Sequence, residues 1–173
     1  PSHSIWTVLR TCLDNMSFRI GFGFDVHALV PGRELWLVGI TIPYELGLQG
    51  HSDADVLIHA ICDALLGAAN LRDIGYHFPD TAGEYKGIDS KILLRKTMTL
   101  IREAGYELGN IDATIAAERP KINPHIPSMK QILAEVMTVS ENDISIKATT
   151  TEKLGFTGRG EGISAYATVL IQK

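Results

Sequence analysis

His51-Ser52-Asp53-Ala54-Asp55-Val56-Leu57-Ile58-His59 opens the stretch of sequence that decides the fold, because polar residues lead here into an apolar-periodic segment. Ser52 or Asp53 can cap a helix that runs through residue 69, in which apolar residues recur at helical spacing. His59 lies one helical turn beyond Asp55, on this segment. We expect the helix to turn His59 back towards the strand that precedes it.

Two strands are predicted before this helix. Residues 18–26 and 34–42 are joined through the Pro31-Gly32 turn signal, which predicts a hairpin. Asp25 and His27 alternate with Val26, so on an extended strand their side chains leave the same face. Two imidazoles and one carboxylate form the ligand set of a catalytic zinc, which keeps a fourth position open for water or substrate. The pattern therefore indicates a divalent-metal site at Asp25, His27 and His59.

The remaining pattern predicts an α+β fold. After a long loop at 71–87, the sequence indicates a helix at 90–104, a strand at 110–117, a helix at 128–136 and strands at 144–150 and 163–171. This order predicts a mixed β-sheet with helices packed on one face, in a single compact domain over residues 18–173. Residues 1–17 carry Met16 just before the first strand, and we interpret them as a tag-like or extended N-terminus.

Composition excludes several classes of function. The chain has 173 residues, 45% of them hydrophobic, which suits one domain with a substantial core. Its 16 basic and 20 acidic residues give a net charge of −4, so no global field favours nucleic acid or an anionic membrane. No apolar stretch is long enough for a membrane span. Cys12 and Cys62 form no CxxC pair, which predicts a reducing, cytoplasmic location.

A second chemical region lies at residues 148–162. Three successive threonines, Lys153, Arg159 and four glycines can bring hydroxyls, cations and backbone N–H groups onto phosphate oxygens. No GxxxxGK[ST] motif occurs here, which argues against P-loop phosphoryl transfer. Glu152, among these neighbours, can hold a hard cation such as Mg²⁺ that bridges to phosphate oxygens.

Each feature has a purely structural alternative. A single histidine on an apolar helix face is more often a core residue with a satisfied ring than a metal ligand. Asp53 and Asp55 can simply cap and charge the first turn of the helix, and we favour that role for one of them. The Thr- and Gly-rich segment can be a flexible turn between strands.

Several motifs in order resemble the family of 2-C-methyl-D-erythritol 2,4-cyclodiphosphate synthases over residues 18–173. They are Gly23-Phe24-Asp25-Val26-His27, His51-Ser52-Asp53-Ala54-Asp55, Asp73-Ile74-Gly75, Phe78-Pro79-Asp80, Pro120-Lys121 with Pro124-His125-Ile126-Pro127, and the run 148–162. The resemblance implies that Asp25, His27 and His59 bind Zn²⁺, with Mn²⁺ or Co²⁺ as alternatives. It also implies that Glu152 binds Mg²⁺ or Mn²⁺ through a substrate diphosphate, with Thr150 beside it in the catalytic set.

The implied reaction belongs to the non-mevalonate route to isoprenoid precursors. In the family, the 2-phosphate of 4-diphosphocytidyl-2-C-methyl-D-erythritol 2-phosphate attacks the β-phosphorus, closes a cyclic diphosphate and expels CMP, as a phosphorus–oxygen lyase. His51 and Ser52 are implied to contact the erythritol phosphate, with Asp73 and Gly75 near its hydroxyls, Asp80 as a further contact and Asp63 orienting a ligand histidine. The cytidine is implied to lie against Ala117, Pro120, Lys121, Ala148, Thr149 and Thr150.

The resemblance also implies a homotrimer with active sites between subunits. Phe156, Arg159 and Glu161 would then line a central channel that takes an isoprenoid diphosphate. Two rival classes stay open from the residues alone. A zinc-dependent phosphoesterase would release inorganic phosphate, and a non-catalytic binding protein would use zinc only to stabilise its fold.

Overall fold

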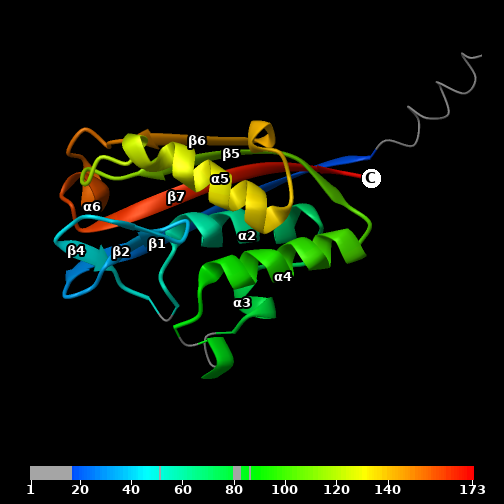
Figure 1. The fold of residues 1–173 in the computed structure, drawn as a ribbon, viewed down its shortest axis with the longest axis horizontal. Helices are drawn as coiled ribbons and strands as arrows, with labels where there is room; N and C mark the ends of the chain where they lie inside the picture. Colours follow the sequence, from blue (N-terminus) through cyan, green and yellow to red (C-terminus); the bar gives the residue numbers. More distant parts are fainter. Residues whose placement is uncertain (1–16, 51, 80–82, 86) are drawn as a thin grey trace, which may run out of the picture.

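A five-stranded mixed sheet forms one layer of the molecule, in the order β4-β1-β7-β5-β6 (Figure 1). The computed structural model describes residues 17–50, 52–79, 83–85 and 87–173. Parallel pairing joins β5 to β6, and the other neighbours in the sheet are antiparallel. The strands are β1 (Phe18–Pro31), β4 (Leu46–Leu48), β5 (Glu107–Ala116), β6 (Ile144–Thr149) and β7 (Gly162–Gln172).

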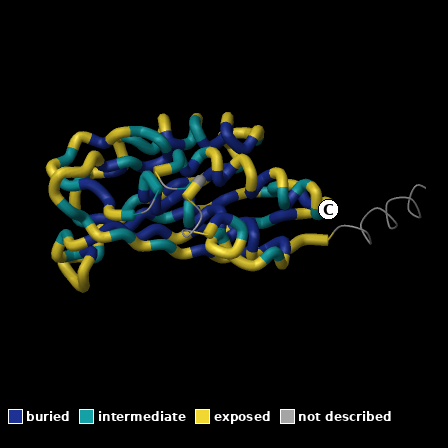
Figure 2. Tube along the Cα trace, turned by 90° about the horizontal axis from the view of Figure 1, so that it is seen from below, coloured by how far each residue is buried: buried dark blue, intermediate teal, exposed yellow. Residues whose placement is uncertain are grey.

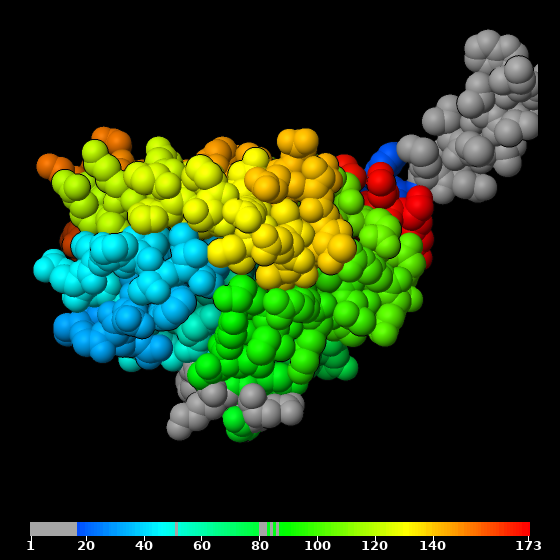
Figure 3. Space-filling model, viewed as in Figure 1, coloured from blue at the N-terminus to red at the C-terminus, as the bar shows by residue number. Residues whose placement is uncertain are grey.

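Helices cover one face of this sheet. In Figure 1 α5 lies in front of β5 and β6, and α4 lies below α2; Figure 3 shows α5 in yellow beside α4 in green. The longer ones are α2 (Val56–Ala68), α4 (Ser90–Glu103) and α5 (Ile126–Met137). The shorter ones are α3 (Ile74–His77), α6 (Gly155–Gly158) and the 3₁₀ turns η1 (Gly83–Tyr85), η2 (Asn123–His125) and η3 (Glu141–Asp143). The predicted fold class, a mixed sheet with helices on one face, is confirmed.

Two glycines of β1 let α2 lie unusually close to the sheet. A Cβ at Gly23 would stand 1.9 Å from the carbonyl oxygen of Ala60, and one at Gly21 would stand 1.8 Å from that of Ala64. Because strand side chains alternate, Asp25 and His27 continue the same face as these glycines. Because these two positions lack a Cβ, the backbone of α2 lies directly beside the predicted metal ligands.

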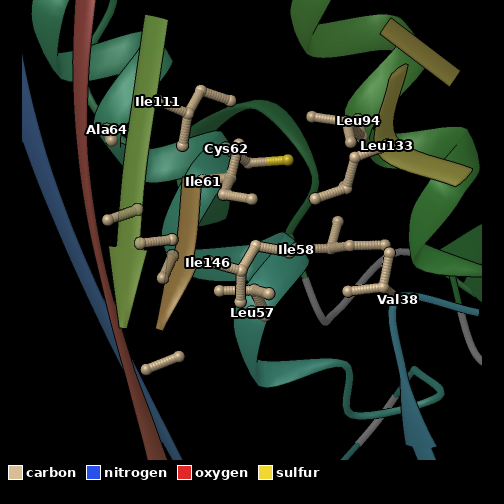
Figure 4. Close-up of a cluster of buried hydrophobic side chains, with 14 of the residues drawn as sticks. Val38, Leu57, Ile58, Ile61, Cys62, Ala64, Leu94, Ile111, Leu133 and Ile146 are labelled. Atoms are coloured by element: carbon tan, nitrogen blue, oxygen red, sulfur yellow. The ribbon is translucent and has the colours of Figure 1, made fainter. Parts of the chain in front are cut away.

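The core lies between the sheet and the helices. Ile58, Ile61 and Cys62 of α2 point into it, towards strands on one side and towards α4 and α5 on the other (Figure 4). All three side chains are fully buried. Figure 2 shows the buried positions concentrated inside the layers and the exposed ones on turns and outer faces.

The predicted hairpin between residues 18–26 and 34–42 is wrong. β1 continues to Pro31 and pairs with β4 and β7 instead. Residues 34–42 divide into β2 (Leu35–Leu37) and β3 (Ile40–Ile42), which pair with each other. Both turn residues between them have positive φ, 54° at Val38 and 67° at Gly39, the geometry of a two-residue hairpin turn. The turn signal that mattered was therefore the glycine at 39.

Other boundaries moved by smaller amounts. The cap of α2 is Asp55, whose side chain accepts a hydrogen bond from the backbone of Ile58, so neither Ser52 nor Asp53 caps the helix. The loop predicted at 71–87 contains α3 and η1. Residues 1–16 of the predicted N-terminal segment lie outside the described residues. Among the residues described, no helix combines the length and apolar character needed to cross a membrane.

Candidate functional site

Asp25, His27 and His59 converge as predicted. The Oδ2 atom of Asp25 lies 3.0 Å from Nε2 of His27 and 3.0 Å from Nδ1 of His59. The two ring nitrogens are 3.4 Å apart. One donor atom from each residue lies within 4.8 Å of the others, which suits a single metal ion. The strand supplies two donors and the helix supplies the third, across the close contact made possible by Gly23.

The carboxylate of this cluster is held in its charged form. Burial disfavours the charge on Asp25, but hydrogen bonds and positive charge from His27 and His59 outweigh burial and lower its pKa to about 2. For His59, burial disfavours the charged ring, and the hydrogen bond to Asp25 reverses that effect and raises the pKa. A charged carboxylate beside two imidazoles is the donor chemistry that a divalent cation requires.

Groups around the cluster orient the rings. Nδ1 of His27 lies 2.7 Å from the carbonyl oxygen of Gln49, which can only accept, so this nitrogen donates and Nε2, which faces Asp25, is the atom that would bind a cation. Nε2 of His59 lies 2.9 Å from the hydroxyl of Ser90 and 3.2 Å from that of Ser52. Sequence reasoning missed Gln49 and Ser90, and only the three-dimensional contact reveals them.

The cluster opens into a cavity of about 460 Å³. Ser52 and Gly75, both predicted to bind substrate, line it together with the three donor residues. Apolar side chains form much of the remaining wall; they are Ile74, Phe78, Tyr85, Ile88 and Leu93. The cavity is large enough for a small polyol phosphate.

Two aspartates near the cavity bind backbone rather than histidine. Asp73 accepts a hydrogen bond from the backbone of Tyr76 at 2.9 Å and caps α3. Asp63 accepts one from the backbone of Ile74 at 2.8 Å. The hydrogen bond of Asp63 therefore fixes α3 against the cavity, and the orientation of a ligand histidine by Asp63 stays a prediction.

A second cavity, of about 340 Å³, lies beyond the carboxyl ends of the parallel strands β5 and β6. It shares no lining residue with the first cavity. The carboxyl edge of parallel strands is a common place for a ligand to bind. All six residues predicted to contact cytidine line it, namely Ala117, Pro120, Lys121, Ala148, Thr149 and Thr150.

The loop that follows β6 is exposed. Glu152 and Lys153 have positive φ, 52° and 64°, and the Glu152 carboxylate accepts a hydrogen bond from the Thr150 hydroxyl at 2.8 Å. Arg159 donates to both carboxylate oxygens of Glu161, at 2.7 and 3.0 Å, and Phe156 is 41% exposed. Thr150 lines the second cavity, whereas Glu152, Lys153, Phe156, Arg159 and Glu161 line neither cavity. His51 and Asp80, also predicted site residues, lie outside the described residues.

Comparisons with known sequences agree with this arrangement. A model of the YgbB family matches residues 18–172. A relative from Parabacteroides distasonis, named 2-C-methyl-D-erythritol 2,4-cyclodiphosphate synthase, is 84% identical over 158 residues, which cover 91% of this chain and 98% of the relative. A Bacteroides fragilis protein of the same name is 75% identical over 158 residues, covering 91% of this chain and 99% of its own length.

Solved structures share the fold. The bifunctional IspDF from Campylobacter jejuni superposes with a TM-score of 0.87 and 43% identity, over 91% of this chain and 42% of that longer chain. A structure of 2C-methyl-D-erythritol-2,4-cyclodiphosphate synthase in its CDP-bound form gives a TM-score of 0.82 and 37% identity, over 88% of this chain and 99% of the other. The chain therefore belongs to the YgbB family, together with relatives that carry the name 2-C-methyl-D-erythritol 2,4-cyclodiphosphate synthase.

Proposed function

We propose that this protein converts 4-diphosphocytidyl-2-C-methyl-D-erythritol 2-phosphate to 2-C-methyl-D-erythritol 2,4-cyclodiphosphate and CMP, as a phosphorus–oxygen lyase of isoprenoid precursor biosynthesis. The convergence of Asp25, His27 and His59 at the mouth of a cavity is the observation that carries the proposal. The 84% identical relative of the same name supports the choice of substrate.

The donor set favours Zn²⁺ at Asp25, His27 and His59, with Mn²⁺ or Co²⁺ as alternatives. We assign a second cation, Mg²⁺ or Mn²⁺, to Glu152 with the substrate diphosphate. When bound, such cations neutralise phosphate oxygens and favour attack of one phosphate on another. An anionic nucleophile and a phosphate leaving group need little acid–base catalysis. The main task of the side chains is therefore to hold the two ends of the substrate.

The two cavities suggest how each end is held. Ser52, Asp73 and Gly75 would bind the methylerythritol phosphate, with His51 and Asp80 as further proposed contacts. The cavity at the end of β5 and β6 would bind cytidine, where backbone groups of Ala148 and Thr149 can read the edge of the base. The two cavities share no lining residue, and we propose that one substrate molecule spans a pair of them that assembly brings together.

A homotrimer would bring them together at subunit interfaces. The sheet face opposite the helices exposes large apolar side chains on β1, among them Ile20 at 72% and Phe22 at 65%. Exposed apolar patches of this kind mark interaction surfaces. A central channel near Phe156, Arg159 and Glu161 would then be free to take an isoprenoid diphosphate.

Replacing Phe22 with glutamate tests the assembly. We expect sedimentation to change from trimer to monomer, with loss of CMP release and retention of tight zinc. The control Ile92→Glu, at a 40% exposed apolar position on α4, should remain trimeric and active. A trimeric Phe22→Glu protein would contradict the proposed interface.

The activity is tested by following the products from the diphosphocytidyl substrate. We expect CMP and a cyclic diphosphate in equal amounts, with loss of activity after exhaustive chelation and recovery when Zn²⁺ and Mg²⁺ are returned. Release of inorganic phosphate would instead identify a zinc-dependent phosphoesterase. Tight zinc with no turnover at all would identify a binding protein. The free, buried thiol of Cys62 is compatible with the reducing cytoplasm that we propose as its location.

A further inference from the structure

A chain of hydrogen bonds leads from the metal cluster to Ser90 and Asp53. Nε2 of His59 lies 2.9 Å from the Ser90 hydroxyl, and this hydroxyl donates to Oδ1 of Asp53 at 2.5 Å. Oδ2 of Asp53 accepts the backbone N–H of Ser90 at 2.9 Å. Ser90 is fully buried at the start of α4, so its hydroxyl is shielded from competing water.

The direction of this chain follows from the number of hydrogens available. A carboxylate only accepts, so the single hydroxyl hydrogen of Ser90 goes to Asp53. The serine oxygen can then only accept from His59, which places the ring hydrogen on Nε2. With a cation bound, this leaves Nδ1 as the ring nitrogen with a free lone pair, and Nδ1 is the atom that faces Asp25 at 3.0 Å and His27 at 3.4 Å. Without a cation, Nδ1 can also carry a hydrogen and donate it to Asp25.

We propose that Ser90 and Asp53 are positioning residues that fix the tautomer and orientation of His59 so that Nδ1 binds the metal. This proposal rests on the metal site of the proposed function and adds two residues to it. Neither residue touches the cation; they act through the imidazole, as groups behind a ligand histidine commonly do. The same two residues tie α4 to the start of α2, so the metal site and the packing of these helices are joined.

Two other roles compete with this one. Asp53 also accepts a hydrogen bond from the backbone N–H of Asp55 at 3.2 Å, so a rival role for these hydrogen bonds is to stabilise the fold alone. The Ser52 hydroxyl, 3.2 Å from Nε2 of His59, is a rival partner for the ring. Because Ser52 is farther from the ring and its oxygen already accepts from the backbone of Ala54, we assign the main role to Ser90.

Zinc affinity of the purified full chain, measured by competition with a chelator, tests the proposal. We expect Ser90→Ala to bind Zn²⁺ about 10- to 100-fold more weakly. Ser90→Thr, which keeps the hydroxyl, should recover most of the affinity. Thr99→Ala provides the matched control, because Thr99 lies on the same helix and its hydroxyl bonds only to the carbonyl of Arg95 among the described contacts.

A spectroscopic measurement on the unaltered protein covers the case in which the variants do not fold. With ¹⁵N-labelled histidine and bound zinc, the proposal predicts a protonated Nε2 on His59 and zinc on Nδ1. Zinc on Nε2 would overturn it. So would a Ser90→Ala protein with unchanged zinc affinity but lower thermal stability, which is the signature of a purely structural role, or a Ser52→Ala protein that alone loses affinity.

The outcomes also separate this proposal from the proposed function. Wild-type protein that binds zinc as predicted but releases no CMP would overturn the synthase and leave the Ser90–Asp53 assignment standing. CMP release by wild-type protein, with full zinc affinity in Ser90→Ala, would overturn only the assignment. Wild-type protein that binds no zinc would overturn both.

Discussion

The metal cluster and the loop after β6 differ in how far a single chain completes them. In the cluster, Asp25, His27 and His59 have side chains only 25%, 20% and 14% exposed, and both rings are held by neighbouring oxygens. In the loop, Arg159 and Glu161 are more than half exposed and bond to each other. The difference teaches that one chain completes a cluster able to hold a cation, whereas it leaves the loop that we propose for the diphosphate exposed.

The contrast has a physical origin in the contact between β1 and α2. The glycines Gly21 and Gly23 have no Cβ, so they set how closely α2 packs on the strand, and α2 in turn sets the position of His59. In the loop, nothing lies within 4 Å of a Cβ built at Gly155 or Gly160, and the close contact of a Cβ at Gly158, 2.2 Å from the backbone carbon of Lys153, stays inside the loop instead of joining it to the core. Precision in the cluster is therefore a property of core packing.

Replacing Gly23 with alanine should give the largest effect. Its Cβ would stand 1.9 Å from the Ala60 carbonyl, so α2 must move and we expect a loss of more than about 3 kcal/mol in the free energy of unfolding. Gly67→Ala is the matched control, because a Cβ there meets nothing within 4 Å and should stabilise the helix by about 0.5–1 kcal/mol. Denaturant unfolding measures both, and equal stabilities would contradict the close-contact account.

Asp25→Ala removes one donor from the finished site. We expect loss of the tightly bound zinc and a fall in CMP release of roughly 10²- to 10³-fold, because the remaining imidazoles cannot hold the cation or balance its charge. Metal analysis and a CMP assay measure the two effects. Glu135→Ala, at an exposed carboxylate on α5, should change neither. Full zinc in Asp25→Ala would argue against the cluster as the metal site.

Asp55 and Asp25 should change the free energy of unfolding with pH in opposite directions. Burial and the nearby charge of Asp53 raise the pKa of Asp55 from 3.8 to about 7. The folded state therefore holds this proton more tightly than the unfolded state, so the stabilisation is complete below about pH 4 and is lost as the pH rises through about 7. Asp25 has the opposite sign in metal-free protein, and its contribution is lost as the pH falls from 3.8 towards about 2.

Asp55→Asn isolates the first of these effects. The amide keeps an oxygen for the cap of α2 but carries no charge. We therefore expect the change in the free energy of unfolding between about pH 4 and 7 to be smaller in the variant by on the order of 4 kcal/mol. Unfolding of metal-free protein across this range gives the measurement. A wild-type curve parallel to that of Asp55→Asn would show that Asp55 is charged throughout.

Glu152→Gln should give the mildest change, and only in function. We expect unchanged zinc content and thermal stability, with CMP release lowered about 10-fold and a higher requirement for Mg²⁺. Titration of activity with Mg²⁺ tests this. If the variant loses zinc or melts earlier, the loop and the cluster are not independent.

The sequence predicted the site better than it predicted the strand pairing. Asp25 and His27 could be placed on one face by strand alternation, and His59 one turn into a helix, because these are local periodicities. The pairing of β1 with β4 and β7 could not be predicted, since it joins residues far apart in the chain. The Pro31-Gly32 signal was misleading because β1 simply continues to Pro31.

The residues that hydrogen-bond to the donor histidines could not be predicted, for the same reason. Ser90 meets His59 from 31 residues away, through the packing of α4 on α2. In the sequence it appeared only as the first residue of a helix. The six residues predicted to contact cytidine lie in one cavity because they come from the ends of two parallel strands or from just beyond them.

Anomalous X-ray diffraction at the zinc edge, on crystals grown with zinc, tests the central claim most directly. The account predicts one strong zinc peak per chain, about 2.0–2.2 Å from an oxygen of Asp25, Nε2 of His27 and Nδ1 of His59. A zinc peak at other residues, with these three side chains still in contact and no metal between them, would contradict it.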